Sequence, residues 1–522
     1  MLLQPKAFDR SFSAVTANTG NGADWGPLLE RLEDRKASAR AMGGAEKVAR
    51  YRASGRLDVR GRLAGLLDPG SFVELGPLAG DPAVPSDAFV AGSGTIEGRP
   101  VTVGAEDFTV AGGSIGTAAA SKRARSAQLA LRNRVPLVMM LEGAGHRATN
   151  ALERNRPAPN DLQAMADLSG LVPTVAIVTG PSAGHGALAA PLSDFVIMVD
   201  GHGALFTAGP PLVAASTGEQ IDKQTLGGPQ VAIDTSGVAH NLAESDEAAL
   251  ALARRYLSYF PSSAWQRAPW VGPACGNHDV GERSLPELLD LIPVNQKRPY
   301  DMRVMLDAVA DAGTVTEIQP TYGTSIVTAL VRIGGHAVAV VANQPMVMAG
   351  AVTVAAAEKA AAFLQVAGAF HLPVLFLADN PGVMAGSAAE KAGILKAGAR
   401  MFAAQHRLRT PKFHVTVRKA FGFGSSVMGM NPYDNQTMTL AFPAVTLGGI
   451  PADVGGRTAK EDDETRRALV ENEASGPWAL AQTLFYDDII DPRELRNILI
   501  RGLGSSVRDD AVAPVAHHGY LL

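Results

Sequence analysis

Apolar residues follow two patterns that alternate along most of the chain. Wholly apolar runs such as 136–141 and 373–378 have the length of buried strands, whereas 117–134 and 352–370 have the period of amphipathic helices. Strand, helix and strand in succession, with continuous apolar strands, predict a largely parallel sheet covered on both faces. The helix 117–134 is expected to carry Lys122, Arg123 and Arg125 on a polar face.

The most apolar long window, 337–357, is interrupted by Asn343, Gln344 and Pro345. We therefore expect a strand, a loop and a helix there, because a membrane span needs about 20 predominantly apolar residues in succession. No membrane association is predicted.

The chain repeats itself once. Residues 96–103 align with 333–340 at an offset of 237 positions, and the same offset relates the strands 136–141 and 373–378. An ordered series at nearly fixed spacing indicates a tandem duplication. Further pairs at this offset, or with one residue of slippage, are Gly113 and Gly350, Lys122 and Lys359, Gly145 and Gly382, Gly184 and Gly422, and Gly186 and Gly424.

The duplication divides the chain into two domains. We expect an N-terminal extension over 1–29, a first domain over 30–265, a linker over 266–294 and a second domain over 295–522. The proposed linker contains Pro269, Gly272, Pro273, Gly276 and Pro293, residues that are typical of exposed connections.

The amino-acid composition excludes several classes of function. The 522 residues are 46% hydrophobic and 19% charged, with a net charge of -4, which gives no reason to expect nucleic-acid binding. The single cysteine, Cys275, excludes an intramolecular disulfide and a Cys-rich zinc site, and no other metal site is predicted. Without an apolar signal peptide, the expected compartment is the reducing cytoplasm.

Two glycine-rich turns follow strands at corresponding places in the two halves. The strand 172–179 leads into 180–187, and the strand 413–417 leads into 418–425. Glycine lets the backbone approach a ligand closely, and a helix start leaves its first N–H groups unpaired. Such donors can bind an anion or stabilise a developing oxyanion.

The first turn admits three other interpretations. Residues 180–184 fit the G-x-S-x-G pattern, which would make Ser182 a hydrolase nucleophile, although Ala420 stands at the corresponding place in the repeat. Gly184-x-Gly186-x-x-Ala189, with Asp200 beyond it, is similar to a dinucleotide-binding pattern. Both turns could also be plain strand-to-helix joints. Their recurrence in both halves favours a functional pair.

Several longer motifs resemble one known family. The chain is similar to the carboxyltransferase (beta) subunits of propionyl-CoA, acetyl-CoA and methylcrotonyl-CoA carboxylases over nearly all of its length. The residues that carry the resemblance are 41–44, 61–63, 67–75, 107–114, 235–240, 341–346, 418–422, 490–492 and 518–519. The resemblance implies an α/β fold of two tandem crotonase-like domains of the ClpP/crotonase spiral type.

The resemblance also implies an activity. The chain would transfer a carboxyl group from carboxybiotin to the α (or vinylogous γ) carbon of an acyl-CoA, through an enolate held by backbone N–H groups. Gly184 and His185 would hold the thioester enolate, and Phe423 and Gly424, beside Gly422, would hold biotin. The biotin anion itself can remove the α proton, so no side-chain acid–base group is required.

Residues near the acyl-CoA are implied in the same way. They are Gly112, Gly113, Lys122, Gly145, Arg147, Gly186 and Ser426. An alternative for Lys122 is an ordinary solvated helix residue. Residues 148–151 depart from the family pattern, which weakens the inference for CoA contacts there.

Two further departures affect the turns. His185 stands where the family commonly has glycine, and the side chain is interpreted as a neutral histidine, with acid–base catalysis as the alternative. Residues 423–426 also differ from the propionyl-type pattern, so a propionyl preference is not inferred.

Biotin must arrive on another protein. The chain has no Met-Lys-Met biotinylation segment and no ATP-binding glycine loop, so a biotin carboxylase and a biotin carboxyl carrier subunit are expected partners. The family resemblance implies a homo- or hetero-hexamer with sites between protomers. The alternatives are a biotin-dependent acyl-CoA decarboxylase subunit and a non-catalytic structural subunit.

Overall fold

The computed structural model describes residues 25–152, 159–432, 434–507 and 512–515. Most of the proposed extension 1–29, and the motif at 518–519, lie outside the described residues. The described chain forms two large sheets related by the sequence repeat, with helices before, between and after them.

The first sheet has the strand order β1-β2-β3-β4-β5-β7-β9. β1 to β3 are antiparallel neighbours, and every pairing from β3 to β9 is parallel. A separate small sheet pairs β6 with β8. The strand bounds are β1 (Val73–Leu75), β2 (Phe89–Ile96), β3 (Arg99–Glu106), β4 (Leu137–Leu141), β5 (Thr174–Val178), β6 (Pro181–Ala183), β7 (Phe195–Val199), β8 (Ala204–Phe206) and β9 (Asn241–Ala243).

The second sheet repeats this plan with the order β10-β11-β12-β13-β14-β15-β17. β14 is a single long strand whose end pairs with β16, where the first unit has the separate β6 and β8. The bounds are β10 (Thr316–Ile318), β11 (Ile326–Ile333), β12 (His336–Asn343), β13 (Val374–Asn380), β14 (Lys412–Phe421), β15 (Met438–Ala441), β16 (Thr446–Gly448) and β17 (Asp488–Ile489).

Strand register confirms the repeat. Thr102 of β3 lies opposite Leu137 of β4, and Ala339 of β12 lies opposite Val374 of β13, which is the same pairing moved by the offset. The hairpins at Glu97-Gly98 and at 334–335 both place two residues at positive φ, as a two-residue type I′ turn requires. The predicted largely parallel sheet is thus present twice.

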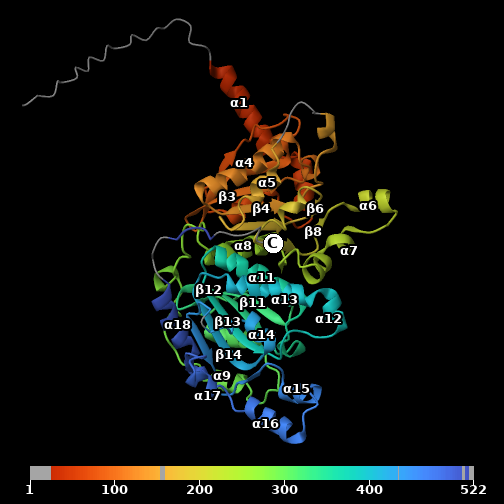
Figure 1. Cartoon of the computed structure of the whole chain (residues 1–522). Coiled ribbons are helices and arrows are strands. Elements are labelled where there is room, and N and C mark those ends of the chain that lie inside the picture. Colours follow the sequence, from red (N-terminus) through yellow and green to blue (C-terminus); the bar gives the residue numbers. More distant parts are fainter. Residues whose placement is uncertain (1–24, 153–158, 433, 508–511, 516–522) are drawn as a thin grey trace, which may run out of the picture.

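Helices and sheets form a stack, which is seen from top to bottom in Figure 1. α4 and α5 cover the outer face of the first sheet, and α9, α10 and α18 cover the outer face of the second. α3, α8, α11 and α13 fill the space between the sheets. The bounds are α3 (Val59–Leu66), α4 (Thr117–Asn133), α5 (Asp161–Ala166), α8 (Asp246–Tyr259), α9 (Glu287–Leu291), α10 (Met302–Val309), α11 (Val354–Ala369), α13 (Ile394–His406) and α18 (Leu495–Ser506).

Alternation along the strands decides which layer each side chain enters. Leu137, Met139 and Leu141 of β4 pack against α4 and α5, whereas Val138 and Met140 enter the core between the sheets. That middle core contains residues of both units, so one continuous apolar layer joins them. Fully buried strands of this kind explain the uninterrupted apolar runs in the sequence.

The predicted polar face of α4 is only partly correct. Arg125 is exposed, but Lys122 and Arg123 are buried among polar partners. A helix face that pairs its charges inside the protein has the same sequence pattern as a face in water. Hydrophobic periodicity therefore could not distinguish the two.

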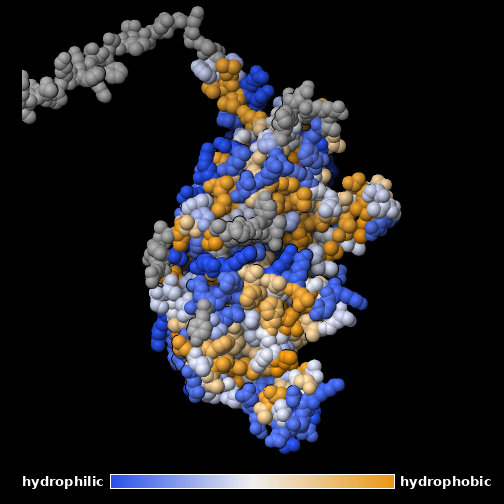
Figure 2. All heavy atoms as spheres, viewed as in Figure 1, coloured by the Kyte–Doolittle hydropathy of each residue, from blue (hydrophilic) through white to orange (hydrophobic). Residues whose placement is uncertain are grey.

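Shorter elements project from this stack. In Figures 1 and 2, α6 extends to the right of the first unit with apolar side chains on its surface, including the exposed Leu212. No helix of the described chain is long and apolar enough to cross a membrane. The remaining helices are α1 (Trp25–Arg40), α2 (Ala45–Arg52), α6 (Pro210–Thr217), α7 (Lys223–Gly227), α12 (Ser387–Ala392), α14 (Gly422–Val427), α15 (Ala452–Thr458), α16 (Asp463–Glu473) and α17 (Trp478–Gln482).

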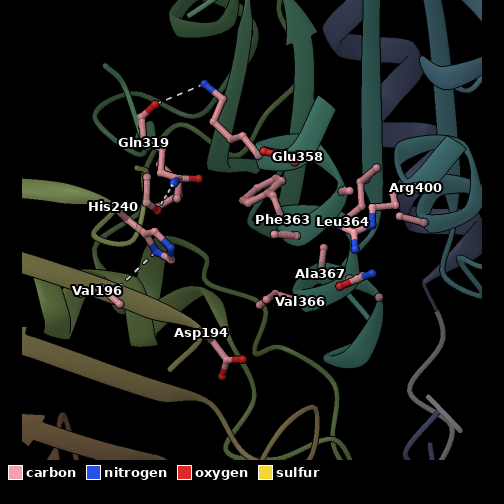
Figure 3. A pocket seen from close by; sticks show the side chains of 18 of the residues that line it. Asp194, Val196, His240, Gln319, Glu358, Phe363, Leu364, Val366, Ala367 and Arg400 are labelled. Atoms are coloured by element: carbon pink, nitrogen blue, oxygen red, sulfur yellow. Dashed lines mark hydrogen bonds between the residues drawn. The ribbon is translucent and has the colours of Figure 1, made fainter. Parts of the chain in front are cut away.

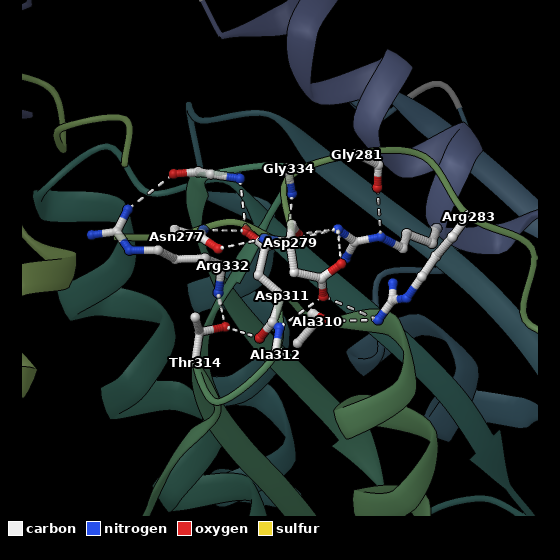
Figure 4. A network of polar contacts seen from close by, with 12 residues as sticks. Asn277, Asp279, Gly281, Arg283, Ala310, Asp311, Ala312, Thr314, Arg332 and Gly334 are labelled. Carbon is white, nitrogen blue, oxygen red and sulfur yellow. Dashed lines mark hydrogen bonds and ion pairs between the residues drawn. The ribbon is translucent and has the colours of Figure 1, made fainter. Parts of the chain in front are cut away.

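The segment between the units is held against the second sheet by the buried carboxylate of Asp311 (Figure 4). Asp311 accepts hydrogen bonds from Asn277 Nδ2 at 2.7 Å and from Arg496 Nη2 at 2.8 Å. It also accepts the N–H groups of Gly334 and Gly335 in the β11–β12 turn, both at 2.8 Å. The Pro- and Gly-rich connection is therefore fixed to the second unit near residue 277.

Candidate functional site

Three loops of the first unit meet at the carboxyl ends of β3, β4 and β5. The N–H of Ala144 donates to Gly112 O at 3.1 Å, and the N–H of Ala183 donates to Gly143 O at 3.0 Å. A Cβ on Gly113 would overlap the carbonyl of Glu142, so this position requires glycine. The fold thus brings together the predicted glycines of the loops near 112, 145 and 184.

The first glycine turn leaves two main-chain donors without an acceptor in the described chain. Gly184 has φ 56° and donates its own N–H to Phe206 O at 3.0 Å. The N–H groups of His185 and Gly186 have no acceptor among the described residues. Only a single 3-10 turn, Ala187–Ala189, follows, so the predicted helix start is shorter than expected.

The second unit builds the corresponding turn on α14. Gly422 has φ 53°, close to the value at Gly184, and Phe423 and Gly424 lie in the first helical turn. Their N–H groups lack intrahelical acceptors, because the first donors of any helix do. A Cβ on Gly424 would overlap Asn380 Oδ1, which explains the glycine there. Phe423 is 45% exposed and offers an apolar ring beside these donors.

The side chain of His185 belongs to an ionic chain that the sequence analysis did not predict. His185 Nε2 lies 2.5 Å from Asp161 Oδ1, and Arg123 Nε lies 2.5 Å from Asp161 Oδ2. Arg123 also donates to Glu106 Oε1 at 2.8 Å. Burial raises the pKa of Asp161, but the hydrogen bond from His185 and the charge of Arg123 outweigh it, so the pKa falls to about 2. Asp161 is therefore an anion at neutral pH.

The two predicted cationic ligands of CoA are engaged within the protein. Arg147 Nη1 lies 2.6 Å from Asp87 Oδ1, and Lys122 Nζ donates to the carbonyl oxygens of Ser86 and Phe89. Burial lowers the pKa of Lys122 to about 8. Both residues hold the segment 86–89, so contacts between these two cations and CoA stay a prediction.

Two residues near the turns differ in accessibility. The Oγ of Ser182 is fully buried and has no hydrogen-bond partner among the described residues, so it lacks the base that a hydrolase nucleophile needs. Ser426 is half-buried one helical turn after Gly422. Ser426 thus lies beside the second turn, and its contact with the acyl group stays a prediction.

A cavity of about 890 Å³ lies elsewhere, between the first sheet and helices α11 and α13 (Figure 3). His240 and Asp194 line it, and burial lowers the pKa of His240 to about 4 and raises that of Asp194 to about 7. Among the described residues, none of the predicted site residues lines this cavity. Nor is there a group of three or more His, Cys, Asp or Glu side chains in the described chain that could hold a metal ion.

Comparison with known proteins gives consistent matches over nearly the whole chain. The model of the carboxyl transferase domain matches residues 50–521. The methylmalonyl-CoA carboxyltransferase 12S subunit of Propionibacterium freudenreichii subsp. shermanii is 32% identical, with 94% of this chain and 96% of the relative covered. The methylmalonyl-CoA decarboxylase subunit alpha of Veillonella parvula is 33% identical, with 94% and 98% covered.

Other matches include the propionyl-CoA carboxylase beta chain of Roseobacter denitrificans, which is 32% identical over 94% of this chain and 98% of the relative. Among solved structures, a chain of the transcarboxylase 12S crystal structure superposes with a TM-score of 0.86 at 32% identity, over 95% of this chain and 98% of that chain. This match confirms the expected α/β fold of two tandem crotonase-like units.

Proposed function

Because the chain belongs to the carboxyl transferase family, we propose that it transfers a carboxyl group from carboxybiotin to the α carbon, or a vinylogous γ carbon, of an acyl-CoA. The observation that supports this activity is the pair of related turns, each with unpaired main-chain N–H groups. At the first turn, the N–H groups of His185 and Gly186 would bind the oxygen of a thioester enolate. Such donors stabilise charge that develops in the transition state. Gly184, expected from the resemblance to share this role, instead donates its N–H to Phe206 O and contributes the bend of the turn.

The second turn suits a biotin ring. The N–H groups of Phe423 and Gly424 would hold the ureido oxygen, and the exposed Phe423 ring provides apolar contact. Carboxybiotin supplies the carboxyl group when its carrier delivers it. The chain's own donors orient that group and the enolate, which lowers the entropic barrier for their reaction.

The two turns follow strands of different sheets, with helices between those sheets. We propose that a complete site combines the first turn of one protomer with the second turn of its neighbour, in a hexamer. The transcarboxylase 12S match, described as a hexamer assembly with substrate bound, supports this arrangement. A biotin carboxylase and a biotin carrier are the proposed partners.

Substitution of Gly424 tests the second turn. Gly424→Pro removes the N–H, and loss of one oxyanion donor costs roughly 10²- to 10³-fold in kcat. We expect carboxyl transfer from free carboxybiotin to a panel of acyl-CoAs to fall by that factor, with acyl-CoA affinity unchanged.

The matched control for this variant is Gly424→Ala. It introduces the same overlap with Asn380 but keeps the N–H, so it should retain more activity than the proline variant. Equal loss in both variants would assign the effect to packing and would contradict a role for this donor.

A decarboxylase is the second candidate function, because the Veillonella parvula decarboxylase subunit is as similar to this chain as the transferases are. Sodium-dependent release of carbon dioxide from a malonyl-type thioester, in the presence of free biotin, would favour it. A chain that transfers nothing to any acyl-CoA, and decarboxylates none, would instead be a structural subunit.

A further inference from the structure

The imidazole of His185 has one occupied and one available nitrogen. Nε2 is bound to Asp161 at 2.5 Å, whereas Nδ1 has no hydrogen-bond partner among the described residues. The side chain is 25% exposed, and the ring of His146 contacts it edge-on with centroids 5.5 Å apart. His185 also supplies one of the main-chain donors of the first turn, so its imidazole lies beside the proposed thioester site.

The groups around the imidazole determine its chemistry. Asp161 of α5 is a fully buried carboxylate, and Arg123 of α4 and Glu106 of β3 continue the chain behind it. His146 is the remaining titratable side chain against the ring. A carboxylate at Nε2 fixes the proton on that nitrogen, leaves a lone pair on Nδ1 and stabilises the imidazolium when Nδ1 gains a proton.

The repeated unit shows that the turn does not need this ionic chain. Phe423 is the counterpart of His185, and its ring lies over Gly398 of α13, where His185 instead meets Asp161 of α5. Phe423 is also close to Phe402, with ring centroids 5.9 Å apart. Apolar packing thus holds the same backbone conformation in the second unit. At this place the second unit has Gly398 and Phe423 instead of Asp161 and His185, so the ionic chain is not needed to build the turn, which indicates a chemical role for it in the first unit.

We propose that His185 is a catalytic acid–base residue that removes the α proton of the acyl-CoA at Nδ1, and that Asp161 is its positioning residue. This inference rests on the proposed function. The Cα–H bond breaks, the N–H bond forms at Nδ1, and the electron pair becomes the enolate, whose oxygen is held by the first turn. The α carbon then bonds the carboxyl carbon as the carboxybiotin C–N bond breaks. The released nitrogen receives the proton from Nδ1.

Hydrogen–deuterium exchange tests this step without biotin. The full chain is incubated in D2O with acetyl-CoA, butyryl-CoA and palmitoyl-CoA, and deuterium at the α carbon is measured by mass spectrometry. We expect exchange with at least one thioester. His185→Gln should lower the rate by roughly 10²-fold or more, as is typical for loss of a general base.

Two variants distinguish catalysis from folding. Asp161→Asn keeps a hydrogen-bond partner but removes the charge that stabilises the imidazolium, so kcat for exchange should fall while the KM for the thioester stays unchanged. His406→Gln is the matched control, because His406 also pairs with a carboxylate, that of Asp434 at 2.8 Å, but is exposed on α13. It should leave exchange unchanged.

The proposal and the proposed function can fail separately. Exchange that needs His185, in a chain that transfers no carboxyl group, would reject the transferase and keep the acid–base role. Absence of exchange by the unmodified chain with all three thioesters would overturn the acid–base role. So would unchanged exchange, or unchanged carboxyl transfer, in His185→Gln.

Discussion

Lys122 and Lys359 are buried lysines at corresponding positions of the two units. Lys122 donates to the carbonyl oxygen of Phe89, and Lys359 donates to that of Ile326 at 2.6 Å. Burial lowers the pKa of Lys359 further than that of Lys122, to about 7. The duplicated contact connects α4 to the start of β2 and α11 to the start of β11. Each contact removes a lysine ammonium group from water, which costs free energy.

This cost predicts a pH dependence of stability. Between the folded pKa of about 7 and the ordinary lysine pKa of 10.5, the unfolded chain binds a proton that the folded chain has lost. The free energy of unfolding therefore rises with pH in that window, by at most about 1.4 kcal/mol per unit for this residue. Lys359→Met should remove that part of the slope in denaturant titrations from pH 7 to 10.

The control for this prediction is Lys396→Met, which changes an exposed lysine of α13. It should keep the slope of the unmodified protein. Identical slopes for Lys359→Met and the unmodified protein would show that Lys359 is not proton-linked to folding.

Loops at the carboxyl ends of the strands depend on close approach of their backbones. Gly112 and Gly113 both have positive φ, but a Cβ on Gly112 has open space, whereas one on Gly113 would overlap the carbonyl of Glu142. The second unit has Ala349 at the place of Gly112, with φ 53°, and Gly350 at the place of Gly113. The duplication thus shows which of the two positions tolerates a side chain.

Alanine substitutions should reproduce this difference. Gly112→Ala introduces only left-handed backbone strain and should lower the free energy of unfolding by about 1 kcal/mol. Gly113→Ala adds a steric overlap that the paired loops must relieve, so a loss of roughly 3 kcal/mol or more is expected. Thermal unfolding of the two variants compares them directly, and equal losses would contradict the explanation.

The two units share the middle apolar layer, and the segment that connects them is fixed to the second unit by the buried network at Asp311. Asp311 and Arg496 are both fully buried, and they connect the segment near residue 277, the β11–β12 turn and α18. A surface ion pair, Glu282 with Arg501, joins the same segment to α18 at 2.6 Å. Two ion pairs therefore hold the connecting segment to α18: the buried pair of Asp311 with Arg496 and the exposed pair of Glu282 with Arg501.

Burial should decide what each pair contributes. Asp311→Ala removes the only fully buried carboxylate that pairs with Arg496, and leaves that guanidinium the more exposed Asp279 at 3.8 Å and main-chain carbonyl oxygens. We expect a cost of about 3 kcal/mol and faster proteolysis of the segment 271–283. Glu282→Ala should cost much less than Asp311→Ala, because water and salt screen exposed pairs. Denaturant titration with limited proteolysis measures both, and a small effect at Asp311 would refute the assigned role.

Much of the architecture was accessible from local sequence. The apolar runs, the repeat and the glycine turns predicted parallel strands, two related units and the approximate position of each turn. The contact between His185 and Asp161 was not accessible, because no periodicity connects a turn to a helix 24 residues earlier. The pattern along α4 predicts a polar face in water for Arg123. The partners that bury this side chain come from β3 and α5, and a pattern within one helix cannot indicate them.

The sequence by itself determined the order of strands and helices, the duplication and the glycines that permit positive φ, since these depend on neighbouring residues and on backbone sterics. Only the tertiary structure decided which charges pair in the interior and which side chain stands beside each turn. Those outcomes depend on residues that are distant in the chain and share a buried space, where an ionised group requires a partner. The aspartate that orients His185 is one of them.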